Sequence, residues 1–217
     1  MGTYLRDAIL MGIIETLQMT FFSSIFAYIL GLPVGIILYA TAKDHILENR
    51  AVNAAVGAIV NILRSLPFLI LLVLMIPVTR FIVGSSIGTT ASIVPLTVGA
   101  IPIVARMVES SLNEVPSGII EAGNSMGASP AFVIFNFILP EAVPSLLLGG
   151  AINVATILGY SAMAGVIGGG GLGAIALQYG YYRYEKSVLW VTVALLVVMV
   201  MLIQEAGGFL SKKTRRS

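Results

Sequence analysis

Residues 16–42 read TLQMTFFSSIFAYILGLPVGIILYATA and contain no charged side chain in 27 consecutive positions. A membrane-spanning helix needs about 20 apolar residues, so this stretch is long enough to cross a bilayer. The whole chain has the same character, because 58% of its 217 residues are apolar and 10% are charged. Soluble domains carry about 25% charged residues. The composition therefore excludes a soluble globular domain, and it equally excludes a disordered chain.

Other stretches along the chain also lack charged residues or nearly lack them: 51–79, interrupted only by Arg64, and 81–105, 142–182 and 187–204. The longest of these contains Gly168-Gly169-Gly170-Gly171 and Gly173, a pattern that indicates a turn or loop. We therefore predict an all-α integral membrane protein. Its five transmembrane helices are expected at about residues 14–41, 54–77, 90–111, 142–166 and 187–208.

The positions of the basic residues predict the orientation of these helices. An odd number of spans places the two termini on opposite sides of the membrane, and cytoplasmic segments are enriched in Lys and Arg. With the C-terminal tail in the cytoplasm, the 42–53 loop and segment 112–141 lie there too, and that side holds seven of the twelve basic residues. The tail dominates this bias through Lys212, Lys213, Arg215 and Arg216. We predict an outside N-terminus and a cytoplasmic C-terminus.

Several kinds of chemistry are excluded by the residues that the chain lacks. There is no cysteine and only one histidine, His45, so we expect no disulfide, no thiolate nucleophile and no multi-histidine metal site. No GxxxxGK[ST] motif occurs, so the chain itself does not bind ATP through a P-loop. A net charge of +2 gives no sign of nucleic-acid binding. We expect no metal and no cofactor in this chain.

Segment 112–141 differs from the rest of the chain because it is too polar to span a membrane. It carries three carboxylates and three prolines: Glu114, Glu121, Glu141, Pro116, Pro130 and Pro140. Its apolar residues are nevertheless too many for a plain loop, and short helices at a membrane boundary have this composition. Pro116 and Pro130 each suit the first turn of a short helix, and Gly127 between them allows a sharp turn.

A spaced motif in this segment carries a family resemblance. Glu121-Ala122-Gly123 is followed by Gly127 and then by Leu139-Pro140. This resembles the cytoplasmic EAA loop of bacterial ABC-importer permeases, in which EAA is followed after three residues by Gly and after nine more by I-x-L-P. Gly123 departs from the usual second Ala, and Phe137 departs from the usual Ile.

The resemblance extends over about residues 12–210 and is closest to methionine-importer permeases. It rests on further matching stretches: 15–17, 31–35, 64–68, 93–99, 159–163 and 170–173. It implies one permease domain over 1–217 in the bacterial inner membrane, with the coupling loop between helices 3 and 4, and this domain pairs with itself as a homodimer. It also implies two separate ATPase subunits that bind ATP and Mg, and an external methionine-binding lipoprotein.

The same resemblance assigns the ATPase-coupling residues to this loop: Glu121, Ala122, Gly123, Gly127, Leu139 and Pro140. Glu121 would pair with a basic group on the ATPase, and Gly127 would make the bend. The alternative is an interfacial loop without a partner.

The fourth helix is the candidate for the translocation pathway, because it combines polar and adaptable side chains with small residues that allow close helix approach. Its candidate residues are Asn153, Tyr160, Ser161 and Met163. Arg64 joins them because a charge within an apolar span often marks function, and Glu15 and Glu205 are its candidate partners. For each of these residues the alternative is ordinary helix packing, or snorkelling in the case of Arg64.

The resulting prediction is a non-catalytic permease subunit that imports methionine, the L form and also the D form, driven by ATP hydrolysis on another chain. Another small amino acid or a related solute is the nearest alternative. A membrane enzyme is disfavoured, because the chain has no HExxH motif and no Cys/His pair. A passive channel or assembly subunit is a third class, which ATP-independent flux would reveal.

Overall fold

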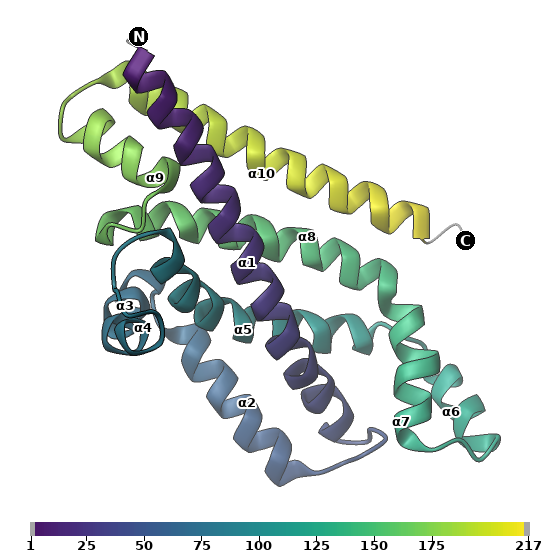
Figure 1. Cartoon of the computed structure of the whole chain (residues 1–217). Coiled ribbons are helices and arrows are strands. Elements are labelled where there is room, and N and C mark those ends of the chain that lie inside the picture. The colour runs from purple at the N-terminus through teal and green to yellow at the C-terminus, as the bar shows by residue number, and fades with distance from the viewer. Residues whose placement is uncertain (1–2, 215–217) are drawn as a thin grey trace.

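The computed structural model of the chain describes residues 3–214 and consists of helices joined by turns and loops, with no strand among the described residues (Figure 1). Arg215 and Arg216 of the basic tail lie outside the described residues. The elements are α1 (Thr3–Thr41), α2 (Arg50–Ser65), α3 (Phe68–Leu74), α4 (Ile76–Val83), α5 (Thr89–Asn113), α6 (Ser117–Ser125), α7 (Pro130–Val133), η1 (Ile134–Ile138), α8 (Leu139–Ala164), η2 (Gly165–Ile167), α9 (Gly171–Ile175), η3 (Ala176–Tyr181) and α10 (Lys186–Thr214).

Four helical segments are long and apolar enough to cross a membrane: Leu5–Thr41, Thr89–Asn113, Pro130–Ile167 and Lys186–Thr214. They coincide with the first, third, fourth and fifth predicted helices. α1 begins at Thr3, well before the predicted start at residue 14, and residues 4–14 form the first part of the same helix. The chain is thus an all-helical membrane protein with four spans, or five if the bent pair of α2 and α3 also crosses.

The second predicted helix is wrong as a single element over 54–77. α2 ends at Ser65, and α3 leaves it at an angle of 101°. The cause is Pro67, which lacks a backbone N–H and pushes the residue before it into an extended conformation. Leu66 accordingly has ψ of 125°. The apolar stretch therefore folds as α2, α3 and α4 rather than as one straight helix.

Buried side chains form clusters along the bundle, including one at each of its two ends. At one end the start of α1 packs against α9 and the start of α10 through Ile9, Leu172 and Val188. At the other end Tyr39, near the end of α1, belongs to the same buried cluster as Val133 of α7 and Ile134 of η1. α10 finishes near the start of α8, where the Ser211 hydroxyl donates to the Pro144 carbonyl at 2.7 Å. The N-terminus and the start of α10 therefore lie opposite the end that carries α6 and α7 (Figure 1).

The longest helix contact is the one between α1 and α5, and it depends on small residues. A β-carbon at Gly35 would lie 2.6 Å from the Ala105 carbonyl oxygen, and one at Gly31 would lie 2.9 Å from the Val104 side chain. Gly at four-residue spacing lets helix backbones approach closely within a membrane. Gly31 and Gly35 are therefore packing residues in this chain.

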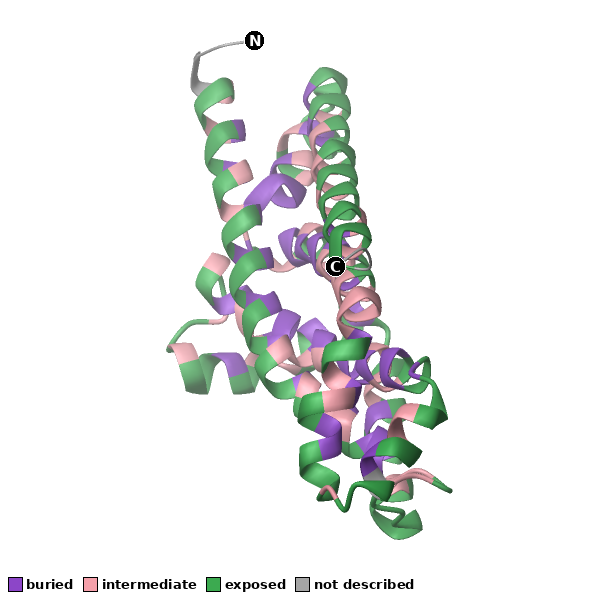
Figure 2. Ribbon diagram, turned by 90° about the vertical axis from the view of Figure 1, so that its right-hand side faces the viewer, coloured by how far each residue is buried: buried purple, intermediate pink, exposed green. Residues whose placement is uncertain are grey.

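Large apolar side chains are exposed on the outer faces of the first and last helices, as the green ribbon in Figure 2 shows. Examples are Ile14, Phe21, Ile29, Trp190, Met201 and Phe209, which are between 53% and 72% exposed. A soluble monomer rarely exposes so large an apolar surface. This surface is suited to contact with lipid.

The glycine-rich turn forms at Gly168–Gly170, but Gly171 and Gly173 belong to α9 rather than to the predicted loop. Gly168 and Gly170 have φ of +83°, which side chains with a β-carbon rarely adopt. The first N–H groups of α9 find acceptors on α1: Glu15 Oε2 accepts from Gly171 N at 2.6 Å, and Thr16 Oγ1 accepts from Leu172 N at 2.9 Å. α1 thereby caps the short helix and fixes it at this end of the bundle.

Candidate functional site

The polar segment 112–141 forms a short helix followed by the start of a long one. α5 ends at Asn113, α6 follows after Pro116, and α7 begins at Pro130. Pro130 occupies the first helical position, where a backbone N–H has no partner within the helix. Its missing N–H therefore costs no hydrogen bond. The Ser129 hydroxyl accepts from the Phe132 N–H at 3.3 Å and so caps the helix start. Pro130 thus lies in the first turn of a short helix, as predicted, whereas Pro116 directly precedes α6 and is not part of it.

The sharp turn expected at Gly127 is present. Gly127 has φ of +73° and follows directly after the last turn of α6. The Ala128 N–H donates to the Gly123 carbonyl at 3.1 Å, which closes the end of that helix. A residue with a β-carbon would be strained in this left-handed conformation. The turn reverses the chain, so α6 lies beside α7 and η1 (Figure 1).

α6 has one outward face and one inward face. Glu121 and Ala122 are exposed, whereas Gly123 is buried. Ile119 and Ile120 on the inward side pack against the buried cluster at this end of the bundle. Among the described residues, the carboxylate of Glu121 takes part in no ion pair. The helix therefore presents an unpaired negative charge on a rigid, outward surface.

The two departures from the loop motif meet in space. A β-carbon at Gly123 would lie 2.9 Å from Val133 Cγ2 and 3.3 Å from Phe137 Cδ2. The larger ring of Phe137 thus stands opposite the smaller residue at position 123. Gly123 leaves room for the Phe137 ring, and α6 packs closely on the following helix.

Leu139 and Pro140 open α8, directly after the wider helical turn of η1. Pro140 cannot donate to the carbonyl four residues before it, and its ring would clash with that carbonyl in a regular helix. The wider turn before Pro140 relieves that clash. Leu139 packs against the buried cluster, whereas Pro140 is exposed. All six predicted coupling residues thus lie between the start of α6 and the start of α8.

The candidate pathway residues of α8 do not share one environment. Asn153 is buried beside Tyr28 of α1. Ser161 is 1% exposed, and its hydroxyl donates to the Leu158 carbonyl at 2.7 Å. Neither side chain lines a surface of this chain. Tyr160 is half-buried and Met163 is 46% exposed. Residues three apart lie on the same face of a helix, so these two side chains are neighbours on α8.

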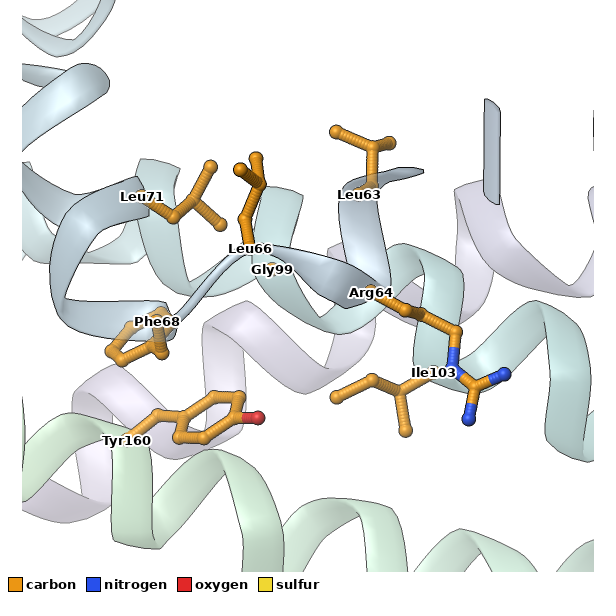
Figure 3. Close-up of a pocket in the computed structure, with 8 residues that line it drawn as sticks. All are labelled: Leu63, Arg64, Leu66, Phe68, Leu71, Gly99, Ile103 and Tyr160. Carbon is orange, nitrogen blue, oxygen red and sulfur yellow. The ribbon is translucent and has the colours of Figure 1, made fainter. Parts of the chain in front are cut away.

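Arg64 and Tyr160 line the same pocket, which the bend at Pro67 opens between α2, α3, α5 and α8. Its volume is about 230 Å³. Figure 3 shows the rings of Phe68 and Tyr160 face to face at one end and the Arg64 guanidinium at the other. The two ring centroids are 4.1 Å apart, with an angle of 6° between the planes. The sequence identifies Arg64 and Tyr160 as candidates for the translocation pathway, but it does not identify Phe68.

The candidate acidic partners of Arg64 are engaged or located elsewhere. Glu15 binds the start of α9, and Glu205 is exposed on α10. Within the described residues, the Arg64 side chain makes no hydrogen bond and no ion pair. Arg106 behaves differently, because it binds Glu109 at 2.7 Å and Asn61 at 2.8 Å. Arg106 thereby ties α2 to α5, a role that the sequence prediction missed.

Residues 31–216 match the protein family described as "Binding-protein-dependent transport system inner membrane component". The chain belongs to this family. It is therefore the inner membrane component of a transport system, and the expectation of a transporter subunit rather than an enzyme is confirmed.

Members of this transport family with curated descriptions resemble the chain closely. It is 50% identical over 207 residues to the probable D-methionine transport system permease protein of Vibrio cholerae, covering 95% of this chain and 92% of that protein. It is 54% identical over 154 residues to the D-methionine transport system permease protein of Escherichia coli K12, covering 71% of each. A chain of the MetNI methionine ABC transporter, in an inward-facing conformation, matches with a TM-score of 0.97, 50% identity and 99% coverage of both chains.

Proposed function

We propose that this chain is the permease subunit of an ABC importer for methionine in the bacterial inner membrane. The observation that carries the proposal is the 50% identity, at 99% coverage, to a chain of a methionine ABC transporter. Curated relatives with about the same identity are described as D-methionine permeases, which supports transport of the D form as well.

In this proposal the whole of 1–217 is one permease domain, which pairs with a second copy to enclose the pathway. The bent pair of α2 and α3 supplies the fifth span, the N-terminus lies outside and the C-terminus is cytoplasmic. Two ATPase subunits, which hold ATP and Mg, dock under segment 112–141, and a substrate-binding lipoprotein docks on the opposite side. The exposed surface and unpaired charge of α6 support this assignment.

The coupling residues have distinct roles in the proposal. Glu121 pairs with a basic group on the ATPase, and Ala122 lies on the same exposed face. Gly123 and Leu139 pack the element against the bundle, while Gly127 and Pro140 shape its two bends. Along the pathway we retain Tyr160, Met163 and Arg64, whereas Asn153 and Ser161 support α8 from inside, in keeping with their burial.

Uptake into vesicles tests the function directly. Proteoliposomes with this chain, its ATPase and its binding protein should accumulate labelled methionine when ATP is supplied, and unlabelled D-methionine should compete. A mixture without ATP is the control. Preferential uptake of another amino acid would contradict the substrate assignment, and uptake without ATP would indicate a passive channel.

A further inference from the structure

We propose that the pocket between Arg64 and the Phe68–Tyr160 ring pair is a transit site for the amino-acid substrate, in which Arg64 binds the carboxylate and the rings contact the apolar side chain. This inference rests on the proposed function and extends it to recognition by the permease itself. It begins with the shape of the pocket. At about 230 Å³, the pocket is smaller than the roughly 300–1,000 Å³ typical of drug-sized ligands, so it suits a small solute.

The aromatic end of the pocket is held rigidly. Phe68 is 8% exposed and stacks on Tyr160, and it lies in close contact with α5 at Gly99. A β-carbon at Gly99 would lie 3.1 Å from Phe68 Cδ2, so there is little room for a larger residue. The ring pair therefore forms a fixed apolar surface. Thioether sulfur makes favourable contacts with aromatic rings, and a flexible unbranched chain adapts to such a surface.

The opposite end of the pocket carries its one charged lining group, Arg64. The guanidinium is exposed and, within the described residues, has no anionic partner. A cation at membrane depth is costly unless an anion or water meets it. Guanidinium binds carboxylates through two parallel hydrogen bonds. An amino-acid carboxylate thus supplies the partner that this chain does not.

The lining residues also indicate which groups of the substrate the pocket does not bind. None of its residues is acidic, so no charged group fixes a substrate ammonium. Recognition then depends on a carboxylate at one end and an apolar chain at the other. A site with only these two requirements accepts both stereoisomers and tolerates a blocked amino group, but it rejects an analogue in which an alcohol replaces the carboxylate.

Equilibrium binding of labelled L-methionine to the purified permease–ATPase complex in nanodiscs, without the binding protein, tests the inference. Arg64→Gln should weaken binding roughly tenfold to hundredfold, the range for a lost hydrogen bond to a charged group, and Arg64→Lys should fall between. Arg80→Gln, which removes an exposed arginine on α4 outside the pocket, is the matched control and should bind normally. D-Methionine and N-acetylmethionine should compete, whereas methioninol should not.

Several results would overturn the inference: no saturable binding by the wild type, unchanged binding by Arg64→Gln, or competition by methioninol equal to that of methionine. A purely structural role for Arg64 would instead lower the thermal stability of the complex, which we expect to stay unchanged. The uptake assay distinguishes a failure of the proposed function from a failure of the transit-site inference. Wild-type vesicles that fail to import methionine contradict the proposed function, whereas normal import by Arg64→Gln contradicts only the transit site.

Discussion

At the scale of single residues, Glu15 and Thr16 position a segment 156 residues further along the chain. The residue before α9 is Gly170, which has no side chain to cap the helix. Acceptors from α1 take over this role, and the glycines leave room for them, since a β-carbon at Gly170 would lie 2.8 Å from Glu15 Oε2. Two polar residues in an apolar helix are thereby explained as structural groups.

Replacing Glu15 by Ala removes the charged acceptor and leaves the Gly171 N–H without its partner. We expect the free energy of unfolding to fall by about 1–3 kcal/mol, the usual cost of such a loss, measured as thermal stability in detergent. Asp7→Ala, at an exposed position of the same helix, is the control and should change stability little. Equal stability of both variants would show that the cap is unimportant.

At the scale of elements, α6 is suited to transmitting force because it is short, rigidly packed and turned outward. Its inward face packs on the bundle through Ile119 and Ile120, and Gly123 brings it close to the next helix. A push on its exposed face would therefore move η1 and α8 with it. The wider turn before Pro140 marks where this motion would enter the long helix.

Glu121→Lys should uncouple the transporter, because it replaces an attraction to the ATPase by a repulsion. We expect methionine uptake to fall at least about tenfold while ATP hydrolysis and the thermal stability of the chain persist. Gly127→Val should act similarly, since Val is strained at positive φ.

Glu114→Lys makes the same charge change at an exposed position of the same segment outside α6, so it controls for charge alone. If Glu121→Lys transports as well as this control, the coupling role of Glu121 is wrong.

At the scale of the whole molecule, the chain has two distinct ends. The loop at residues 84–88 joins the glycine turn, because the Gly88 N–H donates to the Gly168 carbonyl at 3.0 Å. The loop at 42–49 lies with α6 at the opposite end, where Ile46 packs on the same buried cluster as Ile120. The predicted orientation places the second end in the cytoplasm.

Because the chain contains no cysteine, single introduced cysteines report this orientation cleanly. Ser85→Cys should react with a membrane-impermeant maleimide in spheroplasts, whereas Lys43→Cys should react only after lysis. Both positions are exposed, so access depends on the side of the membrane alone. Labelling of Lys43→Cys in intact spheroplasts would reverse the topology.

The sequence predicted the helices that long uncharged stretches mark, because spanning a bilayer requires such stretches. It also predicted the bend at Gly127, because glycine readily adopts the conformation that a sharp turn requires. It did not predict the break at Pro67, since proline also occurs within membrane helices, as Pro95 and Pro102 do in α5. The Phe68–Tyr160 stack, the capping by Glu15 and the contact between Gly123 and Phe137 depend on tertiary neighbours, which a linear pattern does not contain.

The length of α1 has a consequence for the surrounding lipid. Its 27 uncharged residues extend about 40 Å at 1.5 Å per residue, whereas the hydrocarbon layer is about 30 Å thick. The bilayer can thicken locally around α1, or α1 can lean from the bilayer normal. Longer acyl chains would allow it to stand more upright, and Glu15 and Thr16 would carry α9 with it. The hydrophobic thickness of the host membrane thus becomes a variable that sets the geometry of the end of the bundle that carries α9.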